Sequence, residues 1–265
     1  MWLRKPNATP SEYEELCRTI EEQLRFPIAF EGCYKWIVFL NSRINPRIPV
    51  LNRYYGIFQD GKLKVRGIDL RRHDTAGIVR RCQTDVLTTL SKANNSEEFM
   101  TLIPEALTVV RSYVHLIRNG TIPVEDLVIE KHLSKNPNEY RNLVPQAIAA
   151  KHLVAEGMEV HAGQTINYIL TYDKSRINHN RALPTELMDE GSVFDSEKYV
   201  DLLLSSIVNL LLPFGYDLAA LKEPCQANSK NARSSREQFA PQFPCVAFHQ
   251  SSQGQQVYRQ FAESS

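Results

Sequence analysis

The sequence predicts an α+β protein in which a helix and an antiparallel sheet are followed by a mainly helical region and an irregular tail. Three observations support this. Asp60-Gly61 separates two runs rich in aromatic and β-branched residues, which is a strong hairpin signal. After residue 74 the apolar residues take helical spacing, and after residue 222 the periodicity disappears. The expected divisions are therefore 1–74, 75–222 and 223–265.

A helix is expected to open the first region at Pro10, because Ser11 and Glu14 have the spacing of a capping box. Its apolar stripe would consist of Leu16, Ile20 and Leu24. Pro27 would end this helix. Strand-like residues follow at 28–40, a loop at 41–49, and the two hairpin strands at 53–58 and 62–66.

The second region is predicted to be mainly helical. Pro104 is expected to mark a boundary or kink, Asn119-Gly120 a C-cap, and Asp195 an N-cap. The expected helices are 75–92, 97–118, 145–156 and 195–212, with a short helix and strand in 124–133, a strand at 164–172 and a last turn at 217–221.

The tail from residue 224 to residue 265 contains eight Gln and seven Ser without periodicity. Such a composition is typical of a disordered segment. The alternative is that one of its phenylalanines docks on the folded part, Phe239, Phe243 or Phe248.

The overall composition excludes several classes of protein. With 265 residues, 43% of them hydrophobic and 23% charged, the chain is neither collagen-like, wholly disordered nor a disulfide scaffold. No apolar run reaches the roughly 18 residues of a membrane span, and the start lacks a secretory signal. The five cysteines form no Cys-x-x-Cys, so free thiols in the cytoplasm and no zinc are expected.

Positive charge is concentrated between Lys35 and Lys92. This segment has twelve Lys and Arg, four Asp and no Glu, a local charge of +8 in a chain whose formal total is +1. Such a segment indicates a site for a polyanion. A solvated basic face is the alternative, and charge alone does not separate the two.

The second hairpin strand shows how these charges are arranged. Cations alternate with apolar residues in the order Lys62, Leu63, Lys64, Val65, Arg66. Period two places the cations on one face, where a phosphate backbone could follow the strand. An edge strand that lysines protect from aggregation is the alternative. Gly67 would let a backbone come close.

Sequence motifs for catalysis are missing. The chain has no glycine-rich phosphate loop, no nucleophile motif, no His-Glu-x-x-His and no Asp-x-Asp pair for two metal ions. Composition and spacing therefore predict a binding surface without a catalytic centre, and no metal ligand is assigned.

Four stretches resemble family B DNA polymerases of the archaeal and bacterial type. Residues 66–74, Arg-Gly-Ile-Asp-Leu-Arg-Arg-His-Asp, resemble the segment that joins the palm to the thumb. Residues 30–35 resemble a palm strand with a Glu-Gly-x-Tyr core, and residues 52–56 the Lys-Lys-Arg-Tyr motif that holds the primer end. Residues 133–140 resemble the thumb motif that follows the primer-template duplex. The likeness covers about residues 1–222.

This resemblance implies a DNA-directed DNA polymerase, a nucleotidyltransferase of DNA replication that uses dNTPs and two Mg²⁺ ions. It also implies that 1–74 is the C-terminal part of the palm and 75–222 the thumb. The family's Tyr-x-Asp-Thr-Asp-Ser motif, which holds the metals, would lie just before Met1. We therefore expect a C-terminal subunit or fragment that is inactive alone and needs a large part with exonuclease, fingers and most of the palm.

The resemblance also implies roles for particular residues. Arg53 and Tyr54 match the last two positions of the primer motif, while Leu51 and Asn52 stand where the family usually has lysines. Glu31 matches an acidic palm residue near the metals, and a solvated strand carboxylate is its alternative. With the hairpin cations included, the expected DNA-binding residues are Arg53, Tyr54, Lys62, Lys64, Arg66, Gly67, Arg71, Arg72, Asp74, Lys131, Ser134, Lys135 and Tyr140.

Two other functions remain open from the sequence. The chain could be a stand-alone module that binds duplex DNA without regard to sequence, or an inactive relic of a polymerase. Synthesis restored by a complementary large part would separate the polymerase reading from both.

Overall fold

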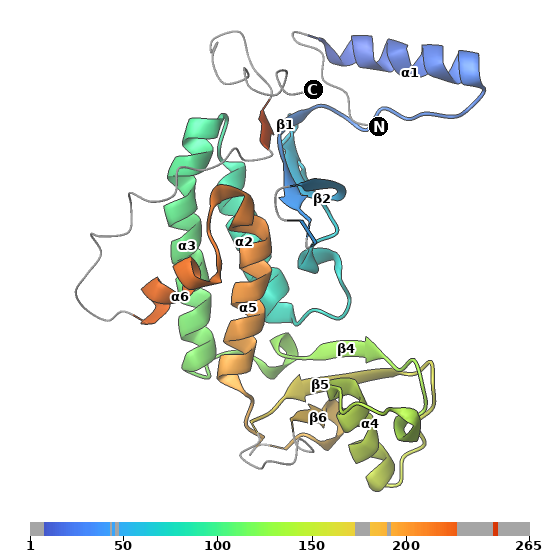
Figure 1. The fold of residues 1–265 in the computed structure, drawn as a ribbon, viewed down its shortest axis with the longest axis vertical. Helices are drawn as coiled ribbons and strands as arrows, with labels where there is room; N and C mark the ends of the chain where they lie inside the picture. The colour runs from blue at the N-terminus through green and yellow to red at the C-terminus, as the bar shows by residue number, and fades with distance from the viewer. Residues whose placement is uncertain are drawn as a thin grey trace.

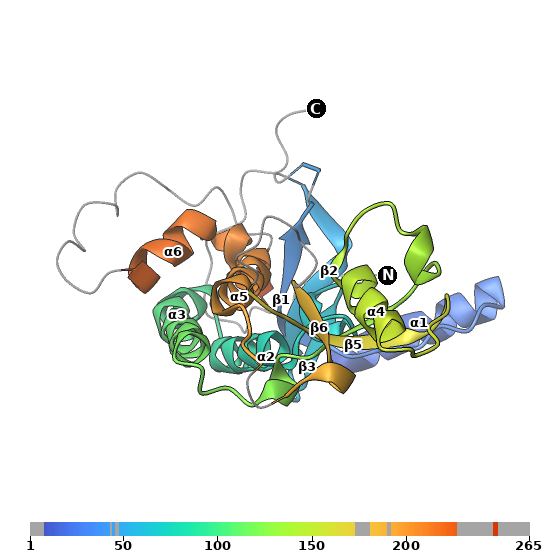
Figure 2. The same cartoon turned by 90° about the horizontal axis from the view of Figure 1, so that it is seen from below.

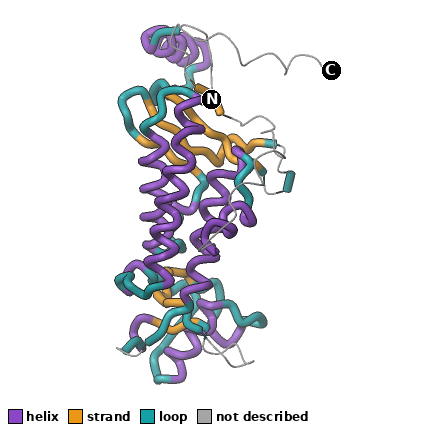
Figure 3. Tube along the Cα trace, turned by 90° about the vertical axis from the view of Figure 1, so that its left-hand side faces the viewer, coloured by secondary structure: helices purple, strands orange, loops and turns teal. Residues whose placement is uncertain are grey.

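Three helices lie side by side in the computed structural model of the chain, together with two small antiparallel sheets (Figure 1). The helices are α2 (Gly77–Ser91), α3 (Ser96–Arg118) and α5 (Ser196–Leu211). One sheet lies alongside the upper part of these helices, and the other lies near their lower ends (Figure 3). The structure describes residues 8–42, 44–45, 48–172, 181–189, 192–226 and 246–248.

The first sheet has the strand order β3-β2-β1-β7. Its strands are β1 (Tyr34–Asn41), β2 (Pro49–Phe58), β3 (Leu63–Arg66) and β7 (Val246–Phe248). The predicted hairpin is confirmed, since β2 and β3 pair antiparallel around Asp60-Gly61. The preceding strand begins at Tyr34 and not at residue 28, because Gly32 takes a φ of 139° that no strand residue adopts.

The first helix is α1 (Pro10–Leu24), and its cap differs from the prediction. Thr9 and Glu12 form the capping box, not Ser11 and Glu14. The helix begins at Pro10, as expected, and Pro10, which has no N–H and a fixed φ, suits the first helical position, so the cap is the residue before it. None of the α1 residues is buried, and the helix projects away from the body of the molecule (Figure 1).

The helical spacing of α2 correctly predicted its buried face. All six apolar residues on that face are buried: Ile78, Val79, Cys82, Val86, Leu87 and Leu90. The next helix, α3, runs through Pro104 without a boundary and ends before Gly120, whose φ is 67°. Asp195 caps α5 as predicted, with its carboxylate accepting the Lys198 N–H.

An aromatic cluster fixes the first sheet to these helices. The Phe99 ring lies 5.0 Å from that of Trp36 in β1 and 4.8 Å from that of Phe214 after α5. Trp36 is fully buried, and its indole N–H donates to the Ala93 carbonyl at 3.2 Å. The sheet and the helices therefore share one hydrophobic core.

The second sheet has the order β4-β5-β6, and α4 (Pro145–Ala155) packs on β5 and β6 (Figure 2). Its strands are β4 (Ile129–His132), β5 (Thr165–Leu170) and β6 (Ala182–Pro184). The first two were predicted, whereas the three residues of β6 are too short for a pattern. The Tyr199 hydroxyl ties α5 to this end, because it donates to Leu127 O at 2.6 Å and accepts the Leu170 N–H at 2.9 Å.

The last part of the chain contains two described elements. The helix α6 (Leu218–Gln226) is longer than the expected turn at 217–221. Residues 246–248 form β7, while 227–245 and 249–265, and with them Phe239 and Phe243, lie outside the described residues. Among the helices that the structure describes, none is long and apolar enough to cross a membrane.

Candidate nucleic-acid interface

Residues 66–74, called here the linker, join β3 to α2 and carry the centre of the candidate site. The linker leaves the first sheet at Arg66, makes a 3₁₀ turn at Asp69–Arg71 and enters α2 at Gly77. Its end contacts β4, so it connects the hairpin with the second sheet. The expected DNA-binding residues thus fall into three groups in order along the chain, together called here the linker path: the hairpin, the linker and the segment 131–140.

Asp74 joins the linker to β4 through two cations. Its carboxylate accepts two hydrogen bonds from Arg72, from Nε at 2.8 Å and from Nη2 at 2.9 Å. The same carboxylate pairs with the Lys131 ammonium of β4. Arg72 also lies 3.8 Å from the carboxylate of Asp69. The structure therefore brings together three residues that the sequence placed in two separate motifs.

These contacts change the ionisation of Asp74. Hydrogen bonds from Arg72 hold the pKa of its carboxyl well below the ordinary value, Lys131 lowers it further, and partial burial opposes both. Asp74 is therefore charged throughout the neutral range. A carboxylate repels phosphate, so this geometry favours a role in which Asp74 positions Arg72 and Lys131 and does not itself contact DNA.

Arg53 and Gly67 hold the hairpin to the start of the linker. The guanidinium of Arg53 donates to Gly67 O from Nε and to Asn41 O from Nη1, both at 3.3 Å. A Cβ at Gly67, where φ is 65°, would lie 2.6 Å from Asn52 O. The backbone that approaches this glycine is thus the chain's own β2, and the close approach expected at Gly67 serves the fold.

Tyr54 differs from its expected place on a DNA-contacting surface. Its side chain is 2% exposed, and its ring centroid lies 5.9 Å from that of Phe39. In this conformation almost none of the Tyr54 side chain is accessible to a ligand. Tyr54 begins a run of four consecutive buried residues, 54–57, so both faces of this part of β2 are covered, and the strand is paired on both sides by β1 and β3.

The hairpin cations differ in their partners. Lys62 is exposed and pairs with Asp60 at 2.7 Å, whereas Lys64 pairs with Glu31. Leu63 and Val65 pack against the core, so the predicted two faces of β3 are confirmed. The carboxylate of Glu31, the expected auxiliary acid, accepts a hydrogen bond from the Lys64 ammonium group. Glu31 lies before β1 and is not part of a strand.

Three cations along this path are exposed and have no hydrogen-bond or ion-pair partner among the described residues. They are Arg66 at the end of β3, Arg71 in the linker and Lys135 after β4. A cation without an internal partner can bind a phosphate without first breaking an ion pair. Of the residues predicted from the sequence, these three are the best suited to contact DNA.

Lys135 lies in a braced turn. The Tyr140 hydroxyl accepts the Ser134 N–H at 2.9 Å and lies 3.3 Å from the Ser134 hydroxyl. Asn136 accepts the Ala162 N–H at 3.0 Å and so ties the turn to the loop before β5. Ser134 and Tyr140 therefore hold each other. No described contact joins them to the hairpin group.

Sequence analysis missed Gln83, which anchors the linker to the core. This side chain is fully buried in α2, accepts the Leu70 N–H at 2.7 Å and donates to Ser206 O of α5 at 3.2 Å. The only sequence signal was a polar residue one position after the buried Cys82, within the apolar face of α2. The partners 13 and 123 positions away carry no local signature.

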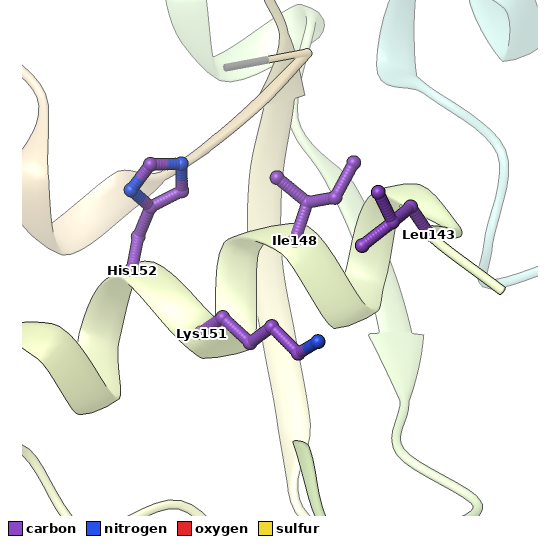
Figure 4. Close-up of a pocket in the computed structure, with 4 residues that line it drawn as sticks. All are labelled: Leu143, Ile148, Lys151 and His152. Carbon is purple, nitrogen blue, oxygen red and sulfur yellow. The ribbon is translucent and has the colours of Figure 1, made fainter. Parts of the chain in front are cut away.

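No group of three or more His, Cys, Asp or Glu side chains that could hold a metal occurs within the described residues. A hollow of about 170 Å³ on α4 is lined by Leu143, Ile148, Lys151 and His152 (Figure 4). This volume is below that of ordinary ligand sites. A second hollow of about 330 Å³ carries Glu159 and Glu186, which would repel a triphosphate. Neither of these two hollows suits a nucleotide.

Comparison with known proteins places this geometry in a family context. A family profile described as DNA polymerase family B matches residues 26–214. The DNA polymerase of Archaeoglobus fulgidus is 25% identical over 242 residues, which cover 85% of this chain and 29% of that protein. The DNA polymerase of Pyrococcus horikoshii is 31% identical over 191 residues, covering 71% and 14%. The chain thus spans less than a third of these relatives.

A solved structure has a similar fold. The family B DNA polymerase from the hyperthermophilic archaeon Pyrobaculum calidifontis aligns with a TM-score of 0.56 and 22% identity, covering 78% of this chain and 24% of that one. At this identity the likeness concerns the fold. The mixture of helices and small antiparallel sheets is therefore one that a polymerase of this kind contains.

Proposed function

Because the chain belongs to DNA polymerase family B, we propose that it forms the C-terminal palm part and the thumb of such an enzyme and holds primer-template DNA. Residues 1–74 would be the palm part and 75–222 the thumb. The observation that carries this proposal is the pairing of Asp74 with Arg72 of the linker and with Lys131 of β4. This pairing joins the two segments that carry the exposed cations, Arg66 and Arg71 in the linker and Lys135 after β4.

The proposed contact is with phosphates and is therefore independent of sequence. Lys and Arg side chains without base-edge geometry fix a duplex by its backbone, and their binding releases counterions. Arg66, Arg71 and Lys135 would contact phosphates directly, while Arg53 and Gly67 keep the hairpin in position. Affinity should consequently fall steeply as the salt concentration rises.

Duplex binding can be tested by titrating a primer-template with the chain over a range of salt concentrations. Arg66→Ala and Arg71→Ala should each weaken binding to all sequences alike and reduce the salt slope by about 1. Arg111→Ala is the matched control, because this arginine of α3 is also exposed and without a described partner. An equal loss in Arg111→Ala, or a loss confined to some sequences, would contradict the proposal.

For synthesis we propose that this chain acts together with a large polymerase part that carries the metal-binding aspartates. Mg²⁺ held there would assist attack of the primer 3′-hydroxyl on a dNTP. This chain's residues would hold and orient the duplex. Glu31, paired with Lys64, is not assigned a metal.

Primer extension tests this division of labour. With Mg²⁺ and dNTPs, the chain alone should make no product, whereas addition of a family B large part ending at its Asp-Thr-Asp-Ser motif should restore synthesis. Extension by the pure chain would refute the division. Inactivity of the mixture with intact duplex binding would favour the stand-alone binding module, and loss of both would favour the relic.

A further inference from the structure

β1 has the sequence of a strand that is paired along both of its edges, including the edge that faces away from β2. Trp36, Ile37 and Val38 are consecutive and buried, with exposed fractions of 0%, 5% and 0%. Consecutive burial means that both faces of the strand are covered, which is typical of a central strand. Lys35 is the only charged residue of β1. Exposed edges normally carry charges or prolines that prevent pairing with other chains.

The opposite edge of the same sheet is protected in that way. There β3 carries Lys64 and Arg66, and Lys62 precedes it. One edge of this sheet is thus charged, while the other is apolar and suited to receive another strand. The difference points to β1 as the side on which the sheet continues.

In this chain β7 occupies the β1 edge. Val246, Ala247 and Phe248 pair antiparallel with Val38, Ile37 and Trp36, which are three of the eight residues of β1. The short dark-red arrow beside β1 shows this strand (Figure 1). Residues 246–248 lie outside the family match at 26–214.

We propose that the β1 edge is a docking site for a β-strand from the part of a family B polymerase that this chain does not span, and that β7 competes for it. The proposal deepens the proposed function and rests on it for the identity of the partner. Until the partner docks, β7 shields the main-chain groups and apolar side chains of β1. When the partner docks, its strand replaces β7.

The length of β7 makes this exchange feasible. It covers fewer than half of the β1 residues, so a longer strand would form more main-chain hydrogen bonds with the same edge. Residues 227–245 separate β7 from α6, and closing a loop of this length has an entropic cost. The tether nevertheless keeps β7 at a high effective concentration. It would therefore exclude weak competitors and yield to the proper partner.

Hydrogen exchange of the β1 amides tests whether β7 covers this edge. Ala247→Pro removes an N–H and fixes φ away from the strand value, so β1 amides should exchange faster than in the original chain. Deletion of 246–248 should have the same effect. Ala232→Pro, the same chemical change in the tail outside β7, is the control and should leave exchange at 34–41 unchanged. Unchanged exchange of the β1 amides in both β7 variants would refute the claim that β7 covers this edge.

Competition is tested by the affinity of the full chain for a family B polymerase part that ends before the segment equivalent to residue 26. If β7 covers the edge about nine-tenths of the time, Ala247→Pro and the deletion should bind about tenfold more tightly. Ala232→Pro should bind like the original chain. Equal affinity in all four chains, or no binding by any of them, would overturn the docking site.

Duplex binding by the same variants separates this inference from the proposed function. Since β7 contributes none of the cations along the linker path, Ala247→Pro should bind primer-template DNA as the original chain does. Failure of every variant to bind DNA, with the partner affinity still raised by Ala247→Pro, would refute the DNA role and leave the strand exchange standing. If neither β7 variant changes the partner affinity while DNA binding is intact, the strand exchange is refuted and the DNA role stands.

Discussion

The helical core and the linker are held in place by different kinds of contact. In the core, Phe99 and its neighbours are fully buried and derive stability from apolar area and close packing. In the linker, few side chains are buried, and position is set by Gln83 and by the Arg72–Asp74–Lys131 contacts. Polar contacts of this kind fix geometry at a lower gain in stability. The linker can therefore leave cations such as Arg71 without partners.

The largest expected effect lies in the core. Phe99→Ala should lower the free energy of unfolding by about 3–5 kcal/mol, because it removes an aromatic ring that contacts both Trp36 and Phe214. Urea unfolding followed by circular dichroism measures it. Met100→Ala, at the next and more exposed position, is the control and should change stability by less than about 1 kcal/mol. A similar loss in both would show that the aromatic cluster is not central.

Gln83→Ala tests where the core and the linker meet. The change leaves the Leu70 N–H and Ser206 O without their partner, and the expected loss is about 2–3 kcal/mol. Hydrogen exchange should show faster exchange at Leu70 than in the original chain. Thr84→Ala, on the exposed side of the same helix, should change neither. Retained protection at Leu70 would mean that the linker is held by other contacts.

The pH dependence of stability tests the Asp74 contacts. Because the folded-state pKa of Asp74 lies below its ordinary value of 3.8, its contribution is present above that value and is lost as the pH falls towards the folded-state pKa. Asp74→Asn should therefore cost about 1–2 kcal/mol at pH 7, where the carboxylate is charged. The difference from the original chain should shrink below about pH 4.

Unfolding in urea at pH 7 and at pH 3 gives this difference directly. Asp60→Asn is the matched control, since Asp60 pairs with Lys62 at the exposed hairpin tip and should show little effect at either pH. A constant difference between Asp74→Asn and the original chain at both pH values would mean that the charge of Asp74 does not stabilise the linker.

The smallest effects distinguish paired from unpaired cations. Arg72→Ala should lower stability by about 1 kcal/mol, because it removes two hydrogen bonds to Asp74. Arg71→Ala, at the next position and without a described partner, should change the free energy of unfolding by less than about 0.5 kcal/mol. Thermal unfolding of both variants measures this. Equal losses would show that Arg71 has a structural role too.

Local sequence signals determined most of the fold. The Asp60-Gly61 pair predicted the hairpin, the spacing of six apolar residues predicted α2, and Asp195 predicted the start of α5. Each signal acts within a few residues, where the chain's own geometry decides the outcome. The same local logic misplaced the cap of α1 by two residues, because both Thr9 and Ser11 have a Glu three positions later, and Pro10 at the first helical position favours Thr9.

Only the tertiary structure decided which residues of the candidate site are buried or have partners within the chain. The sequence placed Asp74 and Lys131 among the DNA-binding residues, but their pairing joins positions 57 apart, and no local pattern records it. The burial of Tyr54, the anchoring of Leu70 by Gln83 and the seating of β7 on β1 depend likewise on packing between distant segments. The sequence by itself determined the family resemblance and where the cations are concentrated. The three-dimensional contacts decided which cations stay unpaired, because electrostatic partners are set by proximity in space and not by spacing along the chain.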